Sequence, residues 1–177
     1  MMKIKDVKVN QKSEFTRRCI GEAVLKLLDS NDFSKLKVSE IAKRAGVSRT
    51  TFYQYYSSPY SVLTDYLNII LSEYILCSEN FSNNRYFDHS HIIFSFNFFD
   101  KYADYFLTLS RHKLHAIMFE EINAFVLNHI FPEKEIAKYK LYAYAGALLN
   151  TFLKWEEDGK KEDLEQIAIT LESIIKK

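Results

Sequence analysis

Residues 38–56 read VSEIAKRAGVSRTTFYQYY, and this stretch decides the fold of the N-terminal part of the chain. Two short segments with helical patterns, Val38–Ala45 and Arg49–Tyr56, flank a Gly-Val-Ser tripeptide. Gly46 suits a tight turn because glycine accepts a positive φ without a Cβ penalty. Ala42 is small enough for two helices to cross closely. The spacing therefore predicts a helix-turn-helix.

The second helix of this motif has a well-defined start. Ser48 is a natural N-cap, and the apolar residue before it pairs with Phe52 in a hydrophobic staple that fixes the entry angle. With Phe52 turned inward, Arg49, Thr50 and Tyr53 face outward. Cations and hydroxyl groups at this end of a helix contact phosphates and base edges. We therefore expect DNA binding; a helical hairpin with a purely structural role is the alternative.

The charge of the chain is unevenly distributed. Residues 1–60 hold 12 Lys/Arg and 6 Asp/Glu, a formal charge of +6, whereas residues 61–177 hold 12 and 17, a charge of −5. A basic head on an acidic body predicts an anionic partner for the head alone. A chance excess of lysine in a solvated tail is the alternative.

Composition predicts an all-α fold. The chain has 4 Gly and 2 Pro in 177 residues, too few turn residues for a strand-rich protein, and its 47% hydrophobic content is enough for a real core.

The two cysteines cannot form a disulfide framework and no apolar signal core opens the chain, so a reduced, cytoplasmic protein is expected. No apolar run approaches the roughly 20 residues of a membrane span, so no membrane association is expected.

Apolar periodicity places about nine helices along the chain. We expect a three-helix helix-turn-helix head at residues 1–57, including a loose arm at 1–12, and a larger helical-bundle body at 58–177 for ligand binding and dimerisation. The expected segments outside the motif are a helix from Phe15 to about Ser30, a helix from Pro59 to about Ser78 after the N-cap Ser58, a polar loop at Phe81–His91, and helices near 91–107, 111–130, 133–157 and 163–175.

Over about a third of its length, the chain resembles the TetR family of transcriptional regulators. The resemblance rests on Ile41–Tyr53, the aromatic pair Tyr55-Tyr56, the Ser57–Leu63 entry to the next helix, and the Leu27–Phe33 exit from the first helix. A weaker likeness, over Tyr144–Gly159, is to the subgroup that includes proteins associated with dihydroxyacetone kinase.

The resemblance implies a homodimeric repressor whose heads occupy successive major grooves of a palindromic double-stranded DNA operator. It also implies a small-molecule effector, bound in the body, that releases the DNA. Thr51, Tyr53 and Tyr55 match family positions that touch bases or phosphate, and Arg49 and Thr50 match positions that choose sequence. The full set of residues expected at DNA is Arg17, Lys37, Ser39, Arg44, Ser48, Arg49, Thr50, Thr51, Tyr53 and Tyr55.

Three positions depart from the family pattern. Lys37 stands where a capping Thr usually opens the first helix of the motif, Ser39 replaces a longer polar or basic side chain, and Pro59 replaces a common lysine. These departures motivate an alternative function, a coactivator or protein-interaction module with a degenerate DNA-binding head. An amphipathic membrane-surface protein is a weaker alternative, because the basic and the aromatic segments do not share helices.

Aromatic residues are concentrated between the expected polar loop and the next helix break. They predict the wall of a pocket for a lipophilic or flat effector, and packing between helices is the alternative. The candidate ligand-binding residues are Phe98, Tyr102, Phe106, Phe119 and Phe152.

Apolar stripes on the last two helices predict a dimer interface, which in the TetR family is commonly a four-helix contact. Packing within one chain is the alternative. The candidate interface residues are Tyr144, Ala147, Leu148, Leu164, Ile167 and Leu171.

Neither a metal site nor an enzyme is expected. The pairs His89/His91 and His112/His115 lack a Cys, Asp or Glu at ligand spacing, so no metal and no cofactor are predicted. The sequence contains no glycine-rich phosphate loop and no nucleophile elbow.

Overall fold

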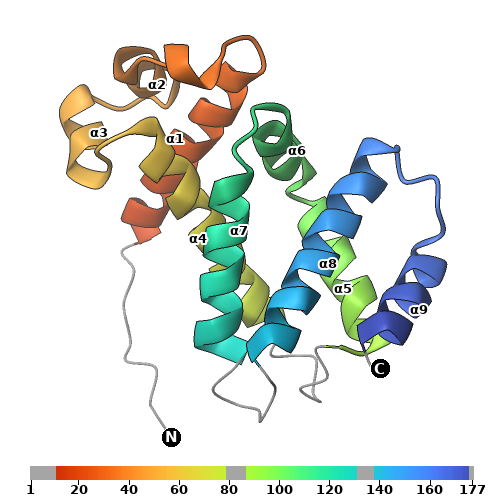
Figure 1. Cartoon of the computed structure of the whole chain (residues 1–177). Helices are drawn as coiled ribbons and strands as arrows, with labels where there is room; N and C mark the ends of the chain where they lie inside the picture. The colour runs from red at the N-terminus through yellow and green to blue at the C-terminus, as the bar shows by residue number, and fades with distance from the viewer. Residues whose placement is uncertain (1–10, 79–86, 131–137, 176–177) are drawn as a thin grey trace, which may run out of the picture. The chain divides into compact units, whose positions relative to one another are not determined.

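The computed structural model describes residues 11–78, 87–130 and 138–175, and within these ranges it contains nine α-helices and no strand (Figure 1). The predicted all-α fold is confirmed. The chain divides into two compact units, Met1–Tyr66 and Leu67–Lys177, and the boundary falls inside the helix α4 (Pro59–Ser78). The functional division expected at residue 57 stays a prediction.

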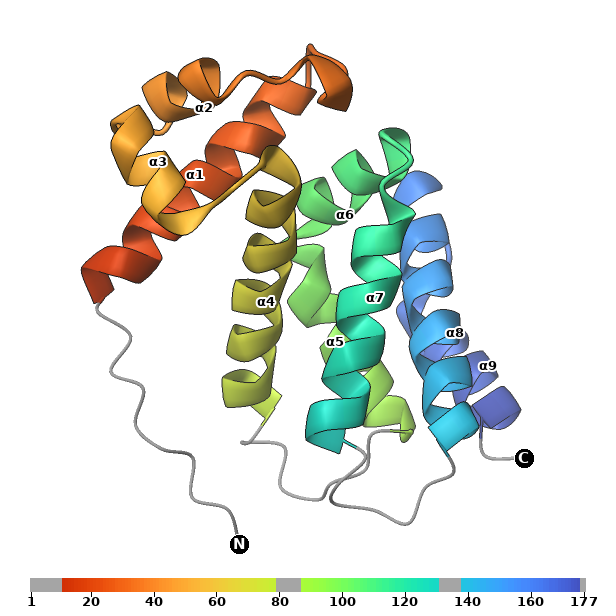
Figure 2. The same cartoon turned by 60° about the vertical axis from the view of Figure 1, so that its left-hand side comes forward.

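The N-terminal unit is a three-helix helix-turn-helix head followed by the first part of α4. Helix α2 packs against both of its neighbours in this unit (Figure 2), which are α1 and α3. The elements of the N-terminal unit before α4 are α1 (Gln11–Leu28), the short 3₁₀ turn η1 (Phe33–Lys35), α2 (Val38–Arg44) and α3 (Arg49–Tyr55). The core of the unit is apolar, with fully buried Ile20, Val24, Ile41, Phe52, Val62 and Leu63.

A glycine lets α1 and α4 approach each other closely. A Cβ atom on Gly21 of α1 would overlap the ring of Tyr66 on α4, which is itself buried. The missing side chain at this position therefore makes room for the aromatic ring, and the two helices share one core.

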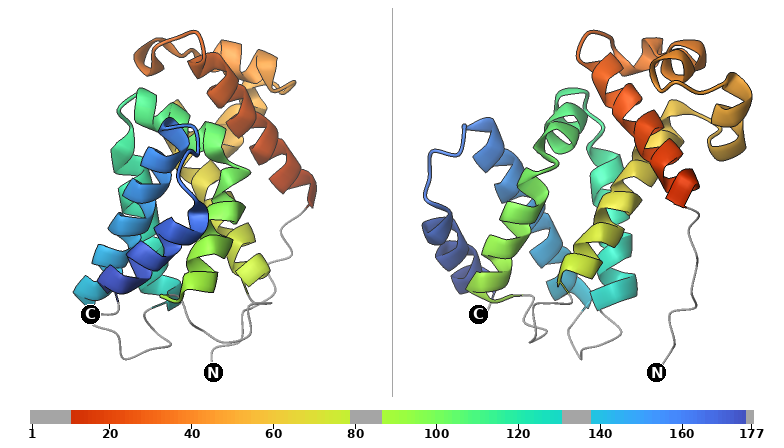
Figure 3. Two further views of the ribbon diagram at one scale, coloured as in Figure 1. Left: turned by 90° about the vertical axis from the view of Figure 1, so that its right-hand side faces the viewer. Right: turned by 180° about the vertical axis from the view of Figure 1, so that it is seen from behind.

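The C-terminal unit is a bundle built around α8. Helix α9 lies beside α5 (Figure 3), and α8 packs against α5, α6, α7 and α9. The elements are α5 (His89–Asp100), α6 (Ala103–Arg111), α7 (His115–Phe125) with its π-helical continuation η2 (Val126–Ile130), α8 (Lys138–Glu157) and α9 (Leu164–Ile175).

Most expected helices are present, and the differences lie at their ends. The long helix α4 has the predicted bounds, and its cap is present because Ser61 N–H donates to Ser58 Oγ at 3.3 Å. Helix α1 begins earlier than expected, at Gln11, so the last part of the expected arm is helical. The rest of that arm, most of the expected loop at Phe81–His91 and the start of the expected 133–157 helix lie outside the described residues.

The prediction of a single helix near residues 91–107 is wrong. The structure has two helices there, α5 and α6, because Tyr102 leaves the helical region with φ −116° and ψ 17°. No glycine or proline marks this break in the sequence. The second of the two helices, α6, continues to Arg111. The helix expected from residue 111 begins at His115 instead.

Three helices end in the same Schellman arrangement of backbone hydrogen bonds. Each of these ends has a residue in the left-handed conformation. It is Gly46 after α2, with φ 68°, Lys113 after α6, with φ 58°, and Gly159 after α8, with φ 76°. The positive φ predicted for Gly46 is confirmed. Lys113 fills a position that glycine usually occupies. A helix break was expected between residues 107 and 111, and α6 ends at Arg111.

Candidate nucleic-acid interface

The start of α3 is held by its capping residue. Thr51 N–H donates to Ser48 Oγ at 2.9 Å, and the two hydroxyl oxygens of these residues lie 2.8 Å apart. Ser48 has an extended backbone, φ −75° and ψ 157°, as an N-cap requires. The predicted cap is confirmed, and it fixes the point at which the chain enters α3.

The two faces of α3 are clearly distinguished by burial. Phe52 is fully buried, whereas Tyr53 is 53% exposed and Tyr55 is 40% exposed. Arg49 and Thr50 are also exposed. The face expected to meet DNA is therefore open to solvent, and the apolar face anchors α3 to the head.

The turn before α3 is as compact as the sequence predicted. Val47 N–H donates to Ala42 O at 3.0 Å, and Gly46 N–H donates to Lys43 O at 3.3 Å. Ala42 is buried, in agreement with its expected place at the helix crossing. These bonds fix the position of α3 relative to α2.

The helix-turn-helix presents cations without anionic partners. Among the described residues, no carboxylate lies within ion-pair distance of Lys37, Lys43, Arg44 or Arg49. All four side chains are exposed. The expected loss of the cap at Lys37 is confirmed, since that side chain makes no capping hydrogen bond.

Arg17 has a partner inside its own unit. Its guanidinium binds both oxygens of Asp65 on α4, with Nε 2.8 Å from Oδ2, and the phenol of Tyr56 donates to the same Oδ2 at 2.7 Å. The bond to Asp65 raises the pKa of Arg17, and burial followed by that carboxylate raises the pKa of Tyr56. We call these three side chains the Asp65 clamp. Sequence analysis missed this clamp, and it gives Arg17 a role in holding α1 to α4.

The structure thus brings most of the expected DNA-contacting residues onto one element pair. Arg17, on α1, stands apart from them and is bound to Asp65. Thr51 is half-buried, and its N–H donates to the N-cap Ser48. The remaining expected DNA-contacting residues are exposed. Those exposed residues, at or within α2 and α3, are Lys37, Ser39, Arg44, Ser48, Arg49, Thr50, Tyr53 and Tyr55.

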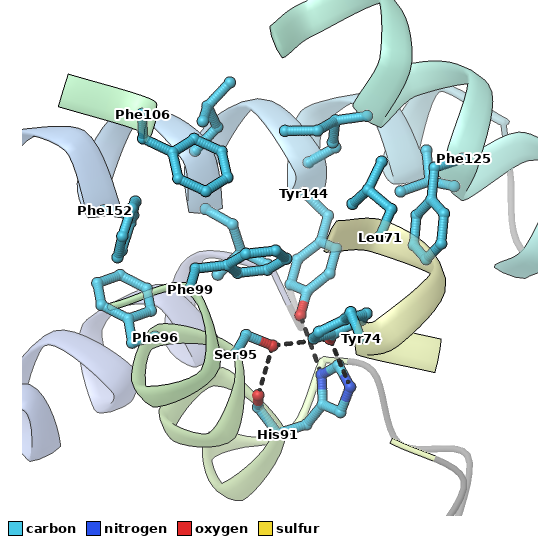
Figure 4. Close-up of a pocket in the computed structure, with 15 residues that line it drawn as sticks. Leu71, Tyr74, His91, Ser95, Phe96, Phe99, Phe106, Phe125, Tyr144 and Phe152 are labelled. Atoms are coloured by element: carbon cyan, nitrogen blue, oxygen red, sulfur yellow. Dashed lines mark hydrogen bonds between the residues drawn. The ribbon is translucent and has the colours of Figure 1, made fainter. Parts of the chain in front are cut away.

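A second candidate site, a cavity of about 70 Å³, lies inside the C-terminal unit. Its wall comes from α4, α5, α6, α7 with η2, and α8 (Figure 4). Five phenylalanines supply much of this wall, namely Phe96, Phe99, Phe106, Phe125 and Phe152.

The expected ligand residues differ in their position relative to the cavity, and their role in ligand binding stays a prediction. Phe106 and Phe152 line the cavity, but Phe98, Tyr102 and Phe119 do not. Phe98 is buried against Lys101 and neighbouring rings, the Tyr102 hydroxyl donates to Glu73 Oε2 at 2.7 Å, and Phe119 is 42% exposed.

The cavity-lining residues of α5 that sequence analysis missed share a simple spacing. His91, Ser95 and Phe99 are four residues apart, so they form one stripe along the helix and all three line the cavity. Aromatic density alone drew attention to Phe98 rather than to this stripe, because density carries no information about which helix face is turned inward.

The expected dimer residues are also divided by the structure. Tyr144 and Leu171 are buried within their own chain, and Tyr144 lines the cavity. These two side chains are therefore interior residues, which corrects the expectation that they face a partner. Ala147, Leu148, Leu164 and Ile167 are half-buried, and Leu148 also lines the cavity. Among the side chains of α9 that the structure describes, the large apolar ones that are exposed are Ile169, at 49%, and Ile174, at 64%.

Two of the histidines, His89 and His91, have side-chain partners within the protein. No group of three or more His, Cys, Asp or Glu side chains suited to hold a metal ion occurs in the described ranges. His89 Nε2 lies 2.5 Å from Glu165 Oε2, and buried His91 contacts Tyr74 and Tyr144. In the same ranges, no helix has both the length and the apolar character needed to span a bilayer.

Comparison with known proteins supports the TetR resemblance. Residues 20–62 match the family described as "Bacterial regulatory proteins, tetR family". No curated protein matches the sequence. Similar solved structures include the dihydroxyacetone kinase operon activator DhaS, with 16% identity over 90% of this chain and 93% of that one and a TM-score of 0.55.

Two further structures show the same fold at similarly low identity. One is the transcriptional regulator FadR from Bacillus subtilis in complex with stearoyl-CoA. It has 16% identity over 89% of this chain and 96% of that one, and a TM-score of 0.56. The other is NalD, the secondary repressor of the MexAB-OprM multidrug efflux pump in Pseudomonas aeruginosa. It has 17% identity over 93% of this chain and 95% of that one, and a TM-score of 0.58.

The helix-turn-helix at residues 20–62 matches that of bacterial regulatory proteins of the TetR family. The chain as a whole has the fold of the solved regulators described above.

Proposed function

We propose that this protein is a homodimeric repressor that binds a palindromic DNA operator through α2 and α3 and is released by a small-molecule effector. The observation that carries the proposal is the exposed face of α3, with Arg49, Thr50 and Tyr53 on a helix whose start is capped and whose opposite face is buried. A surface of this kind reads DNA only if it is rigid, and the cap together with Phe52 supplies that rigidity.

The chemistry of the exposed face suits a major groove. An arginine at the first turn of a recognition helix can donate two hydrogen bonds to a guanine, and threonine and tyrosine hydroxyls can bond to base edges or phosphates. Lys43 and Arg44 end α2 with positive charge and have no ion-pair partner among the described residues, so they are available to phosphates.

The two proposed partners of the C-terminal unit, a second copy and an effector, have separate surfaces. The exposed Ile169 and Ile174 on α9 support association with a second copy, because paired apolar helices remove such side chains from water. The cavity supports an internal ligand. Helix α4 contributes Leu71 and Tyr74 to the cavity wall and also carries Asp65 of the clamp, so a ligand acts on a helix that is bonded to the head.

The proposal is tested by selecting binding sequences from a pool of random DNA duplexes. We expect a palindrome whose half-sites lie about one helical turn, roughly 34 Å, apart. Arg49→Ala and Tyr53→Ala should lose binding to the selected duplex in a gel shift while circular dichroism shows unchanged helix content. Lys35→Ala, which removes an exposed cation outside the motif, is the matched control and should bind as the wild type does.

Retention of binding by Arg49→Ala would contradict the proposed interface. If no duplex is enriched at low salt while the protein forms a stable complex with another protein, the function is instead that of a coactivator or interaction module. The feature that favours this second function is the uncapped start of α2 at Lys37, which leaves one anchor of the motif absent.

A further inference from the structure

The cavity in the C-terminal unit has a wall that is apolar over most of its extent (Figure 4). The apolar side chains come from α4, α5, α6, α7 with η2, and α8. An apolar molecule leaves water without losing hydrogen bonds when it enters such a space. Most of the described side chains that line the cavity are aliphatic or phenylalanine, and the exceptions are Tyr74, His91, Ser95 and Tyr144.

The polar side chains of the wall already have hydrogen-bond partners in the protein. Tyr74 Oη lies 2.9 Å from Ser95 Oγ and 3.0 Å from His91 Nε2, and Ser95 Oγ donates to His91 O at 2.7 Å. Tyr144 Oη lies 3.4 Å from His91 Nδ1. Each of these side chains therefore has at least one partner before any ligand enters, and a ligand does not have to supply a hydrogen-bonding group in order to bind.

Three rings of the wall pack edge to face, and we call Phe99, Phe106 and Phe152 the phenylalanine cluster. The ring centroid of Phe106 lies 5.6 Å from that of Phe99 and 5.4 Å from that of Phe152, with interplanar angles of 82° and 79°. Aromatic rings favour this arrangement because the positive edge of one ring meets the negative face of the next. A further flat ring can join the cluster in the same way, whereas a saturated ring is thicker and lacks this charge distribution.

The size of the cavity limits the ligand to one ring. Its volume is about 70 Å³, less than the ~150 Å³ of an engineered apolar cavity that binds benzene. A ring therefore enters only if the wall yields. The lining side chains Ile122, Phe125 and Leu148, on α7 and α8, are half-buried and have room to move outward. A ligand with two or more rings would have to displace buried core side chains as well.

Charge on the ligand is disfavoured by the described wall. A carboxylate or an ammonium group leaves water when it enters the cavity, and aliphatic and phenylalanine side chains cannot replace the hydrogen bonds that it loses. Aromatic faces attract cations, but this attraction is small compared with the free energy needed to remove an ammonium group from water. An uncharged ligand is therefore favoured over an anion or a cation of similar size.

We infer that the effector is a flat, uncharged, one-ring aromatic compound that packs against the phenylalanine cluster. The inference rests on the proposed function, because it names the ligand class of the same effector cavity. The phenylalanine cluster selects for the flat ring. The volume of the cavity selects against larger compounds.

The test is direct calorimetric titration of the full-length protein, without DNA, with toluene, methylcyclohexane, benzoate and benzylamine at neutral pH. Toluene and methylcyclohexane have the same number of carbon atoms and no charge, but only toluene is flat. Benzoate and benzylamine carry opposite charges on a similar ring. We expect toluene to bind about threefold more tightly than methylcyclohexane and at least about tenfold more tightly than either charged compound.

Variants locate the ligand in the cavity. Phe99→Leu removes one ring of the cluster at a half-buried position and should abolish the preference for toluene over methylcyclohexane. Phe119→Leu, the same substitution at an exposed phenylalanine outside the wall, is the matched control and should keep that preference. Ala145→Leu fills the cavity and should abolish toluene binding, whereas Ala143→Leu, at an exposed position of the same helix, should not. Circular dichroism checks that each variant keeps its helix content.

Methylcyclohexane binding as tightly as toluene, a charged compound binding more tightly than toluene, or no binding of toluene would each overturn the inference. A Phe99→Leu variant that keeps the preference for toluene, or a folded Ala145→Leu variant that still binds it, would overturn the placement of the ring. Because binding is measured without DNA, a protein that binds toluene as expected but selects no duplex contradicts the proposed function and leaves the ligand class supported.

Discussion

Arg17 and Arg18 are adjacent and carry the same charge, yet their side chains have different partners. Arg17 reaches across to Asp65, 48 positions along the chain, whereas Arg18 Nε donates to Glu14 on its own helix at 3.1 Å. A long-range partner of this kind has no local sequence pattern, because it depends on where α4 passes α1. Exposed motif residues such as Arg49 are easier to identify, since the helix period fixes the face on which they lie.

The Asp65 clamp leads to a prediction about stability. Asp65→Ala leaves the Arg17 guanidinium and the Tyr56 hydroxyl without their shared acceptor, in a site where the ion-paired side chains are about a quarter exposed. We expect a loss of about 2 kcal/mol in the free energy of unfolding, measured by urea denaturation. Asp29→Ala, at an exposed ion pair of 3.9 Å with Lys26, should cost less than about 0.5 kcal/mol. Equal losses in the two variants would mean that the clamp does not stabilise the head.

Gly21 leads to a second prediction at the same scale. Because a Cβ atom there would overlap the buried Tyr66 ring, Gly21→Ala should lower the free energy of unfolding by about 1–3 kcal/mol even though alanine is the better helix former. Glu22→Ala, at the next and exposed position of α1, should change it by less than about 0.5 kcal/mol. A stabilised Gly21→Ala variant would show that α1 and α4 are not packed this closely.

At the scale of elements, the predicted bounds are best where a local signal starts or ends a helix. Ser48 and Ser58 cap α3 and α4, and Gly46 ends α2, so these helices have the expected bounds within about one residue. The break between α5 and α6 at Tyr102 is different. It coincides with a hydrogen bond from Tyr102 to Glu73 on α4, which is a tertiary contact and leaves no trace in the neighbouring sequence.

The end of α8 gives a pH-dependent prediction. Burial raises the pKa of the Glu156 carboxyl above its ordinary value of 4.5, Lys160 opposes the rise and Asp100 adds to it. The folded state then binds this proton more tightly than the unfolded state does. Its contribution to stability is therefore present below the ordinary pKa and is lost as the pH rises through the higher folded value.

Glu156→Gln removes this titration. The free energy of unfolding of the wild type, relative to Glu156→Gln, should therefore decrease as the pH is raised from about 4 to about 7. Glu162→Gln, at an exposed position just beyond α8, serves as the control for removing a carboxylate that is not buried. Parallel pH profiles for the wild type and Glu156→Gln would contradict the assignment of this proton to Glu156.

At the scale of the whole molecule, the basic N-terminal part and the acidic remainder predict a salt-dependent affinity for DNA. If Lys37, Lys43 and Arg44 of each subunit contact phosphates, the logarithm of the binding constant should fall with the logarithm of salt concentration at a slope of about −5. Arg44→Ala, which affects both subunits of a dimer, should reduce the magnitude of that slope by about 2.

Fluorescence anisotropy with the selected duplex, repeated over a series of salt concentrations, measures both slopes. Lys161→Ala removes an exposed cation from the C-terminal unit and should leave the slope unchanged. A wild-type slope near zero, or an equal reduction in Lys161→Ala, would be inconsistent with phosphate contacts from the helix-turn-helix.

The described wall of the cavity in the C-terminal unit is formed largely by phenylalanine rings. Solutes that suit an apolar wall also dissolve in lipid. An effector of this kind would cross a bilayer without a carrier, and the response of the proposed repressor would follow the concentration of that solute outside the cell.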